Sequence, residues 1–185
     1  SCNTTCKGGI IMKHLQLPLS MEERMQLKAG DLLLLSGTIY TARDAAHKRL
    51  NDLLNQGKPL PLPLQDQIIY YVGPTPAPPG HIYGSAGPTT SMRMDAYAPR
   101  LYDLGLAATI GKGYRTQPVT DACIRNHSLY LVAIGGAGAL LGKCVKKVEP
   151  VAFEDLGAEA ITKLEVEDFP VTVAIDTQGN NVYQK

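Results

Sequence analysis

The chain has 185 residues, of which 44% are hydrophobic and 19% are charged, and its formal net charge is +1. This composition is typical of one globular domain with a sizeable core. The low charge and the absence of Trp argue against nucleic-acid or membrane-surface partners. No apolar run approaches the roughly 20 residues that span a bilayer. The polar N-terminal segment does not resemble a signal peptide, so we expect a cytoplasmic protein.

The four cysteines predict neither a disulfide framework nor a metal site. Cys2 and Cys6 lie in a short polar segment, and their C-x-x-x-C spacing has no second His or Cys pair nearby. We therefore expect residues 1–11 to be a disordered leader. Cys123 falls in an apolar helical pattern and Cys144 lies close to two lysines, so both are expected to be structural.

Helices and strands alternate through residues 12–185, which we expect to form a single domain. The sequence Ser20-Met-Glu-Glu23 is a capping box that opens a short helix. Residues 31–40 predict a buried strand. Thr41 is a candidate cap for the amphipathic helix that follows, and Gly57 closes that helix.

The middle of the chain begins with a strand at residues 68–72 and a proline-rich, extended connector at residues 73–80. A helix is expected from Thr89 until Pro99 ends or kinks it, with a further helical turn up to Gly105. The remaining predicted elements are strands at 107–110, 129–134, 148–153, 164–166 and 171–175, helices at 116–126 and 138–141, and turns at 135–138 and 177–180. This mixture predicts an α/β domain whose sheet is not purely parallel.

The segment GSAGPTTSMRMD at residues 84–95 is the most informative part of the chain. If a helix begins near Thr89, then Thr89 and Arg93 are spaced i, i+4 and share a face. Free backbone N–H groups, a hydroxyl and a guanidinium would then converge, which is the chemistry of a carboxylate or phosphate site. The alternative is an ordinary capped helix with Arg93 facing solvent.

Two further junctions between a strand and a helix carry cations. Arg43 falls in the first turn of a predicted helix, where a cation opposes the helix dipole unless an anion is bound. It is alternatively a surface partner of Asp44, and His47 on the same face is more simply a structural group. Lys112, between two glycines, follows a predicted strand at the edge where α/β sheets bind ligands. Its alternative is a lysine on a flexible turn.

Together, Arg43, Arg93 and Lys112 supply three positive charges from three separate junctions. Their convergence would suit a dicarboxylate, because arginine binds a carboxylate with two hydrogen bonds. The sequence offers no paired acidic dyad, no metal-binding cluster and no nucleophile elbow. It therefore predicts either a binding module or one part of an enzyme.

Three segments, read together, resemble a known family. TARDAAH at residues 41–47, GPTTSMRMD at 87–95 and KGYRT at 112–116 resemble the β subunit of class I iron–sulfur fumarate hydratases and L(+)-tartrate dehydratases. They are equally similar to the C-terminal domain of the one-chain forms. The resemblance spans residues 15–183 and implies a swivelling β/β/α three-layer domain with a mixed sheet.

The resemblance implies a hydro-lyase that is active only with an α subunit, in a hetero-oligomer such as α2β2. The α subunit would hold a [4Fe–4S] cluster whose unique iron acts as a Lewis acid, and this chain would bind no metal or cofactor itself. The expected reaction is the reversible hydration of fumarate to (S)-malate, a step of the tricarboxylic acid cycle. Dehydration of tartrate to oxaloacetate, or a non-catalytic anion-binding or assembly module, stay open as alternatives.

The resemblance also assigns residues. Arg43, Thr89, Arg93 and Lys112 match substrate-binding positions of the family, and Thr89 matches the threonine proposed to donate or accept a proton. Fixed cations would stabilise the negative charge that builds on a carboxylate as a proton leaves the neighbouring carbon. An ordinary hydroxyl is a poor acid near neutral pH, so Thr89 would need nearby cations for this role.

Overall fold

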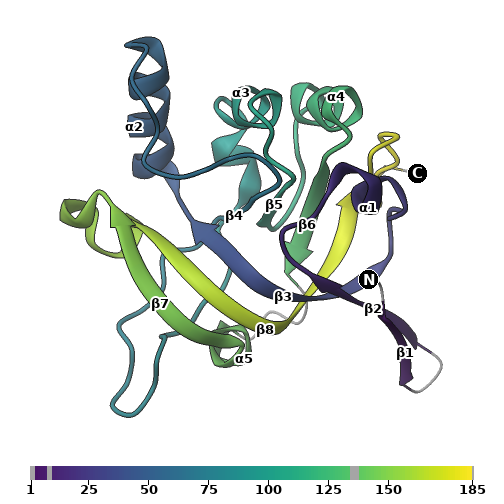
Figure 1. The fold of residues 1–185 in the computed structure, drawn as a ribbon, viewed down its shortest axis with the longest axis horizontal. Helices are drawn as coiled ribbons and strands as arrows, with labels where there is room; N and C mark the ends of the chain where they lie inside the picture. The colour runs from purple at the N-terminus through teal and green to yellow at the C-terminus, as the bar shows by residue number, and fades with distance from the viewer. Residues whose placement is uncertain (1–2, 8–9, 134–137, 185) are drawn as a thin grey trace.

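The computed structural model describes residues 3–7, 10–133 and 138–184, and Figure 1 shows their arrangement. In this part of the chain eight strands form one mixed sheet, accompanied by five α-helices and two 3₁₀ helices. The expectation of an α/β domain with a sheet that is not purely parallel is confirmed. No helix of the described residues is long and apolar enough to cross a membrane.

The strands are β1 (Asn3–Lys7), β2 (Ile10–Gln16), β3 (Leu32–Thr41), β4 (Ile68–Tyr70), β5 (Ala108–Gly111), β6 (Leu129–Ala133), β7 (Val145–Ala152) and β8 (Ile161–Ile175). The α-helices are α1 (Met21–Met25), α2 (Asp44–Asn55), α3 (Ala98–Asp103), α4 (Gln117–Asn126) and α5 (Gly138–Lys143). The 3₁₀ helices are η1 (Ser91–Met94) and η2 (Glu154–Glu159).

Strand β8 closes the sheet into a ring. The strands β3, β4, β5 and β6 pair in parallel, in that order. Strand β8 pairs antiparallel with β6 through one part of its length and with β3 along most of the rest. The pairings therefore return to β3. Strand β2 extends the sheet beside β3, and β7 extends it beside β8.

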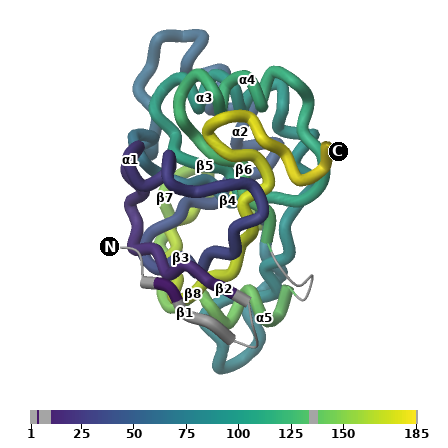
Figure 2. The backbone as a smooth tube through the Cα atoms, turned by 90° about the vertical axis from the view of Figure 1, so that its right-hand side faces the viewer, coloured from purple at the N-terminus to yellow at the C-terminus, as the bar shows by residue number. Residues whose placement is uncertain are grey.

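The two faces of the strands pack into two separate cores. In and just after β4, Ile68 and Tyr70 join one cluster with residues of β3 and β8, whereas Ile69 and Tyr71 join the other. This alternation follows from the period of two along a strand. The second cluster contains the apolar faces of α2, α3 and α4, which lie together at one end of the molecule in Figures 1 and 2. Because both faces are buried, the strand reads as a continuous apolar run.

Local signals in the sequence placed the helices well. Ser20 caps α1 by a complete capping box, with its Oγ accepting from the Glu23 N–H at 3.2 Å. Thr41, however, does not cap α2. It is the last residue of β3 and its Oγ1 lies 2.7 Å from the Thr162 Oγ1 on β8, so Arg43 takes the N-cap position.

Two segments differ from the expected secondary structure. The disordered leader expected at residues 1–11 is not what the structure has in its described part, because β1 and the start of β2 pair antiparallel there. The strands predicted at 164–166 and 171–175 are one strand, β8, with a register shift beside the exposed residues 167 and 168. Of the turn expected at 135–138, only Gly138 lies inside the described residues, as the first residue of α5.

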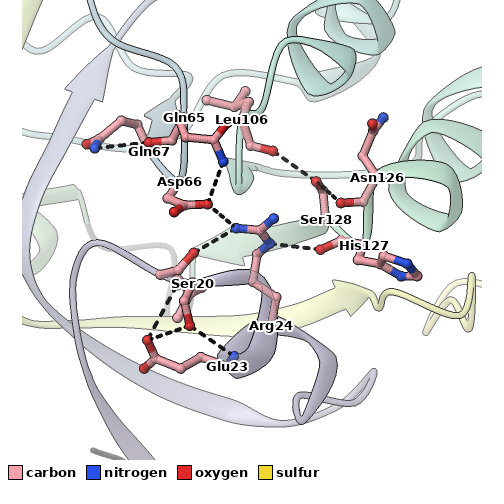
Figure 3. A network of polar contacts seen from close by, with 11 residues as sticks. Ser20, Glu23, Arg24, Gln65, Asp66, Gln67, Leu106, Asn126, His127 and Ser128 are labelled. Carbon is pink, nitrogen blue, oxygen red and sulfur yellow. Dashed lines mark hydrogen bonds and ion pairs between the residues drawn. The ribbon is translucent and has the colours of Figure 1, made fainter.

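A buried arginine ties together the edge of the sheet where β4 and β6 begin (Figure 3). Arg24 is 1% exposed, and its Nε donates to the His127 carbonyl at 2.8 Å. Its Nη1 donates to the Leu19 carbonyl at 2.7 Å and to Asp66 Oδ1 at 2.8 Å. One guanidinium therefore links α1 to the segments that lead into two strands.

We expect the substitution Arg24→Ala to lower the free energy of unfolding by about 3 kcal/mol, because it leaves the buried Leu19 carbonyl and the partly buried His127 carbonyl without their donor and removes the ion-pair partner of Asp66. Urea denaturation followed by circular dichroism measures this. The matched control is Arg125→Ala, whose ion pair with Asp103 is about half exposed on both sides and is worth at most about 1 kcal/mol. Equal losses in the two variants would contradict the assignment.

Candidate functional site

The three junctions singled out in the sequence lie at the opposite edge, where parallel strands end. Arg43 follows β3 and Lys112 follows β5. Thr89 lies beside the end of β4, because its N–H donates to the Tyr71 carbonyl at 2.7 Å. Carboxyl ends of neighbouring parallel strands are the common ligand-binding edge of α/β sheets.

The segment around Thr89 does not form the expected helix. A single 3₁₀ turn, η1, begins only at Ser91, and neither Thr89 nor Thr90 caps it. The Ser91 N–H donates to the Lys112 carbonyl at 3.0 Å, and Thr90 pairs with Lys112 as an isolated parallel bridge. The backbone here is used to extend pairing with β5. A helix N-terminus with free N–H groups is therefore not part of this site, and the predicted i, i+4 helical relation of Thr89 to Arg93 is wrong.

Of the positive side chains at this edge, Arg93 and Lys112 are exposed to solvent, whereas Arg43 is partly buried. The Arg93 side chain is 52% exposed, and its guanidinium forms an ion pair with Asp44 at the start of α2. The sequence predicted Asp44 as the partner of Arg43, and the structure corrects this. The ion pair connects the segment of Arg93 to the junction of Arg43, and the Thr90–Lys112 bridge connects the same segment to the junction of Lys112. The structure therefore links the three junctions in sequence.

Arg43 is held between two other segments. Its Nε lies 4.0 Å from Glu159 Oε1 of η2, and this carboxylate also accepts from the Ala45 N–H at 3.4 Å. The guanidinium packs against Gly73, where an added Cβ would lie 2.8 Å from Nη1. A side chain at residue 73 would therefore push the Arg43 guanidinium out of this position. Arg93 is thus paired closely with a carboxylate of the same chain, whereas the buried Arg43 Nε lies 4.0 Å from one and makes no hydrogen bond within the described residues.

His47 supports the backbone that carries Arg43. The His47 Nδ1 lies 2.8 Å from the Arg43 carbonyl, and the ring packs edge-on against Tyr71. Burial lowers the pKa of His47 from 6.5 to about 4. The imidazole is therefore neutral near pH 7, and Nδ1 carries the proton that it donates to Arg43. The structural interpretation of His47 is confirmed by this geometry.

Asp95 and Arg115 lie within two of the sequence motifs, but the sequence assigned them no role. The Arg115 Nε donates to Asp95 Oδ1 at 2.6 Å, and the guanidinium is fully buried. The sequence indicated a role for these residues only by their positions, with Asp95 at the end of one motif and Arg115 near the end of another. Their spacing of 20 residues could not show that they meet.

The residues at this edge suit an anion rather than a metal. Among the described residues, no three His, Cys, Asp or Glu side chains are grouped so that they could hold a metal ion. Cys123 is buried in the core, as expected, and burial raises the pKa of its thiol to about 12. The described residues thus do not fit an iron–sulfur cluster, whereas guanidinium and ammonium groups fit carboxylates.

A hollow of about 550 Å³ lies elsewhere, between the proline-rich connector and α5. Its lining includes Tyr83, Ser85 and Lys143, but none of Arg43, Thr89, Arg93 and Lys112. The four residues lie instead at an open edge of the sheet. A ligand held only by them would keep one side uncovered.

The cations at the carboxyl edge of the parallel strands make this edge a candidate anion site. The chain belongs to the family described as Fumarase C-terminus, whose model matches residues 7–185. It is 42% identical to fumarate hydratase 2 of Leishmania major over 89% of this chain and 29% of that protein. It is 41% identical to the anaerobic class I fumarate hydratase of Escherichia coli over 97% of this chain and 33% of that protein.

A third relative has a similar length. The chain is 38% identical to a Methanocaldococcus jannaschii protein whose name assigns it as an L(+)-tartrate dehydratase subunit beta, over 90% of this chain and 89% of that protein. By contrast, the chain spans only about a third of the length of the fumarate hydratases it matches. In the relatives of greater length, this sequence corresponds to one part of a larger protein.

The low pKa of His47 predicts how stability depends on pH. Between pH 6.5 and about 4 the unfolded chain binds a proton that the folded chain does not, so stability falls as the pH falls through this window. We expect a loss of about 2 kcal/mol between pH 7 and pH 5 from this residue. Urea denaturation at both pH values should show a smaller loss in His47→Asn. Identical losses in the two proteins would contradict the burial of a neutral imidazole.

Proposed function

We propose that this chain is the β subunit of a hydro-lyase that reversibly hydrates fumarate to (S)-malate. The observation that carries the proposal is that Arg93 pairs with Asp44, and that Arg43 lies 4.0 Å from Glu159, at the edge of the sheet where the parallel strands end. Each arginine is thus already placed where a carboxylate can reach it. Family membership supports the reaction, because relatives of 37–42% identity include proteins named fumarate hydratase.

Dehydration of L(+)-tartrate to oxaloacetate is the second candidate. The Methanocaldococcus jannaschii relative favours this reaction, because this chain covers 89% of that protein's length. Tartrate is also a four-carbon dicarboxylate and differs from malate by one hydroxyl group. The same three cations would serve either substrate, so the two reactions must be separated by experiment.

In the proposed mechanism, Arg43, Arg93 and Lys112 bind the two carboxylates of the substrate. Arginine offers a planar fork of donors, whereas lysine adds a compact charge. As a proton leaves the carbon beside a carboxylate, negative charge moves onto that group. Cations already fixed beside it stabilise this charge more strongly than they stabilise the ground state.

Thr89 is proposed to move the proton at that carbon. Its N–H is anchored to the Tyr71 carbonyl, which fixes the residue at the end of β4. Because no helix begins there, the acidity of its hydroxyl must be supported by the side chains of Arg93 and Lys112 rather than by a helix dipole. An acidic residue on a partner chain would complete the exchange of the proton.

We further propose that the partner is an α subunit that holds a [4Fe–4S] cluster, and that this chain folds as the swivelling β/β/α domain which closes over it. The open edge of the sheet and the greater length of the fumarate hydratases support a second protein surface at the site. No step of the mechanism above is assigned to the cluster. An α2β2 arrangement is the simplest assembly of the two chains.

The proposal is tested by mixing the chain with its α subunit without oxygen. We expect fumarate to form from malate, seen by its ultraviolet absorbance, and oxaloacetate from tartrate is assayed in parallel. The faster reaction identifies the substrate. Activity with neither substrate would contradict the proposed function and favour a non-catalytic anion-binding module.

In the reconstituted enzyme, Arg93→Ala should lower kcat/KM about a hundredfold, which corresponds to about 2.7 kcal/mol of lost charge stabilisation. The matched control is Arg100→Ala, an exposed arginine that contacts Asn51 and Asn55 on α2. This control should keep kcat/KM within about twofold. Unchanged kinetics in Arg93→Ala would remove that residue from the site.

Thr89→Val should lower kcat about a hundredfold or more while KM changes little, because a general acid–base group contributes roughly 10²–10⁴-fold. Thr89→Ser keeps the hydroxyl and should retain most of the activity. Steady-state kinetics in both directions measures the split. A loss confined to KM in Thr89→Val would assign Thr89 to binding alone.

A further inference from the structure

A buried polar network joins the segments that carry Arg93 and Lys112. The Arg115 guanidinium is completely buried, and it uses each of its nitrogens. Its Nε donates to Asp95 Oδ1 at 2.6 Å, its Nη1 to Thr109 Oγ1 at 3.0 Å and its Nη2 to the Tyr71 hydroxyl at 3.2 Å. The guanidinium therefore joins the end of β4, β5 and the residue that follows η1.

Asp95 joins the two site segments through its second oxygen. Its Oδ2 accepts from the Thr116 N–H at 2.6 Å and from the Thr116 Oγ1 at 2.8 Å. Asp95 directly follows η1, which carries Arg93, whereas Thr116 ends the loop that begins at Lys112. The Asp95 carboxylate thus uses both of its oxygens to hold the segment of Arg93 to the loop that begins at Lys112.

A second set of contacts fixes the same two segments near Lys112. The buried Tyr130 hydroxyl lies 2.8 Å from both Ser91 Oγ and the Gly113 carbonyl, and Ser91 Oγ accepts from the Lys112 N–H at 3.0 Å. A Cβ on Gly111 would overlap Ser91 Oγ, so glycine is required there. The Arg115 guanidinium also lies 4.6 Å from the centre of the Tyr130 ring, so the two sets form one network.

We infer that Arg115, Asp95 and Tyr130 are positioning residues, which hold Thr89, Arg93 and Lys112 in the geometry that binds the dicarboxylate; this rests on the proposed function. None of the three presents its functional atoms to the site surface, so they act through the segments that they join. A buried ion pair adds little net stability compared with apolar packing. Its contribution here is a fixed relation between two loops that contain little regular structure.

The chain contains its own control for this inference. The buried Arg24 forms another arginine–aspartate pair, with the partly exposed Asp66, at the edge of the sheet where β4 begins. Both arginines are at most 8% exposed as whole residues, and both also donate to other groups. Replacing either by lysine keeps the charge but removes the rigid fork. Both substitutions should therefore destabilise the fold, and only one should disturb the site.

The experiment compares Arg115→Lys, Tyr130→Phe and Arg24→Lys in the complex with the α subunit. We expect lower unfolding midpoints in urea for both lysine variants. Only Arg115→Lys and Tyr130→Phe should lower kcat/KM, by roughly ten- to a hundredfold, mainly through a higher KM, because small misplacements of binding groups are costly. Tyr130→Phe removes a single hydroxyl, so it tests the same inference if Arg115→Lys does not fold. Equal kinetics in all three variants and the unchanged protein would overturn the inference.

Hydrogen exchange of the chain alone separates this inference from the proposed function. The amides of Ser91, Lys112 and Thr116 donate within the network, so they should exchange at least about tenfold faster in Arg115→Lys than in Arg24→Lys. This readout needs no substrate and no partner. Faster exchange without any hydro-lyase activity in the unchanged complex would uphold the network and reject the proposed function. Equal exchange in the two lysine variants would overturn the positioning role.

Discussion

The antiparallel pairing of β8 with both β6 and β3 is the constraint on which the rest of the structure depends. It turns an open parallel sheet into a ring, so every strand of the ring pairs with two other strands of the ring. With the ring closed, β3, β4 and β5 must end at the same edge and cannot slide relative to one another. One core then fills the ring and the other lies beneath α2, α3 and α4. The cations gather at this edge as a consequence of the topology.

An ion pair between a buried arginine and an aspartate lies at each end of the parallel strands. At the edge where the parallel strands begin, Arg24 donates to two carbonyls and to Asp66. These contacts hold together segments to which we assign no role at the candidate site. At the carboxyl edge, the buried Arg115–Asp95 pair anchors loops that carry exposed cations. Buried charges cost desolvation energy at both ends, which several hydrogen bonds to each guanidinium offset. The difference lies in what each pair supports.

The sequence predicted the local structure better than the meeting of distant residues. The capping box at Ser20 and the apolar runs of β3 and β4 were readable, because they depend on neighbours in the chain. The helix expected at Thr89 failed because the backbone of residues 89–91 pairs with Tyr71 and Lys112, and no propensity reports such pairing. The cations were found through motif resemblance and charge. The Arg115–Asp95 pair was missed because neither residue is exposed and they meet only through the fold.

The carboxylates of Asp44 and Glu159 reduce the repulsion among the three cations that share one edge of the sheet. Arg43, Arg93 and Lys112 alone would repel one another, because three like charges would share one edge of the sheet. The two internal carboxylates neutralise most of that charge and leave one net positive charge at the edge. A dicarboxylate that binds there must compete with them, so its affinity reflects the difference between two sets of similar contacts rather than their sum. Weak ground-state binding of this kind favours a site whose cations act most strongly when charge builds on the substrate during the reaction.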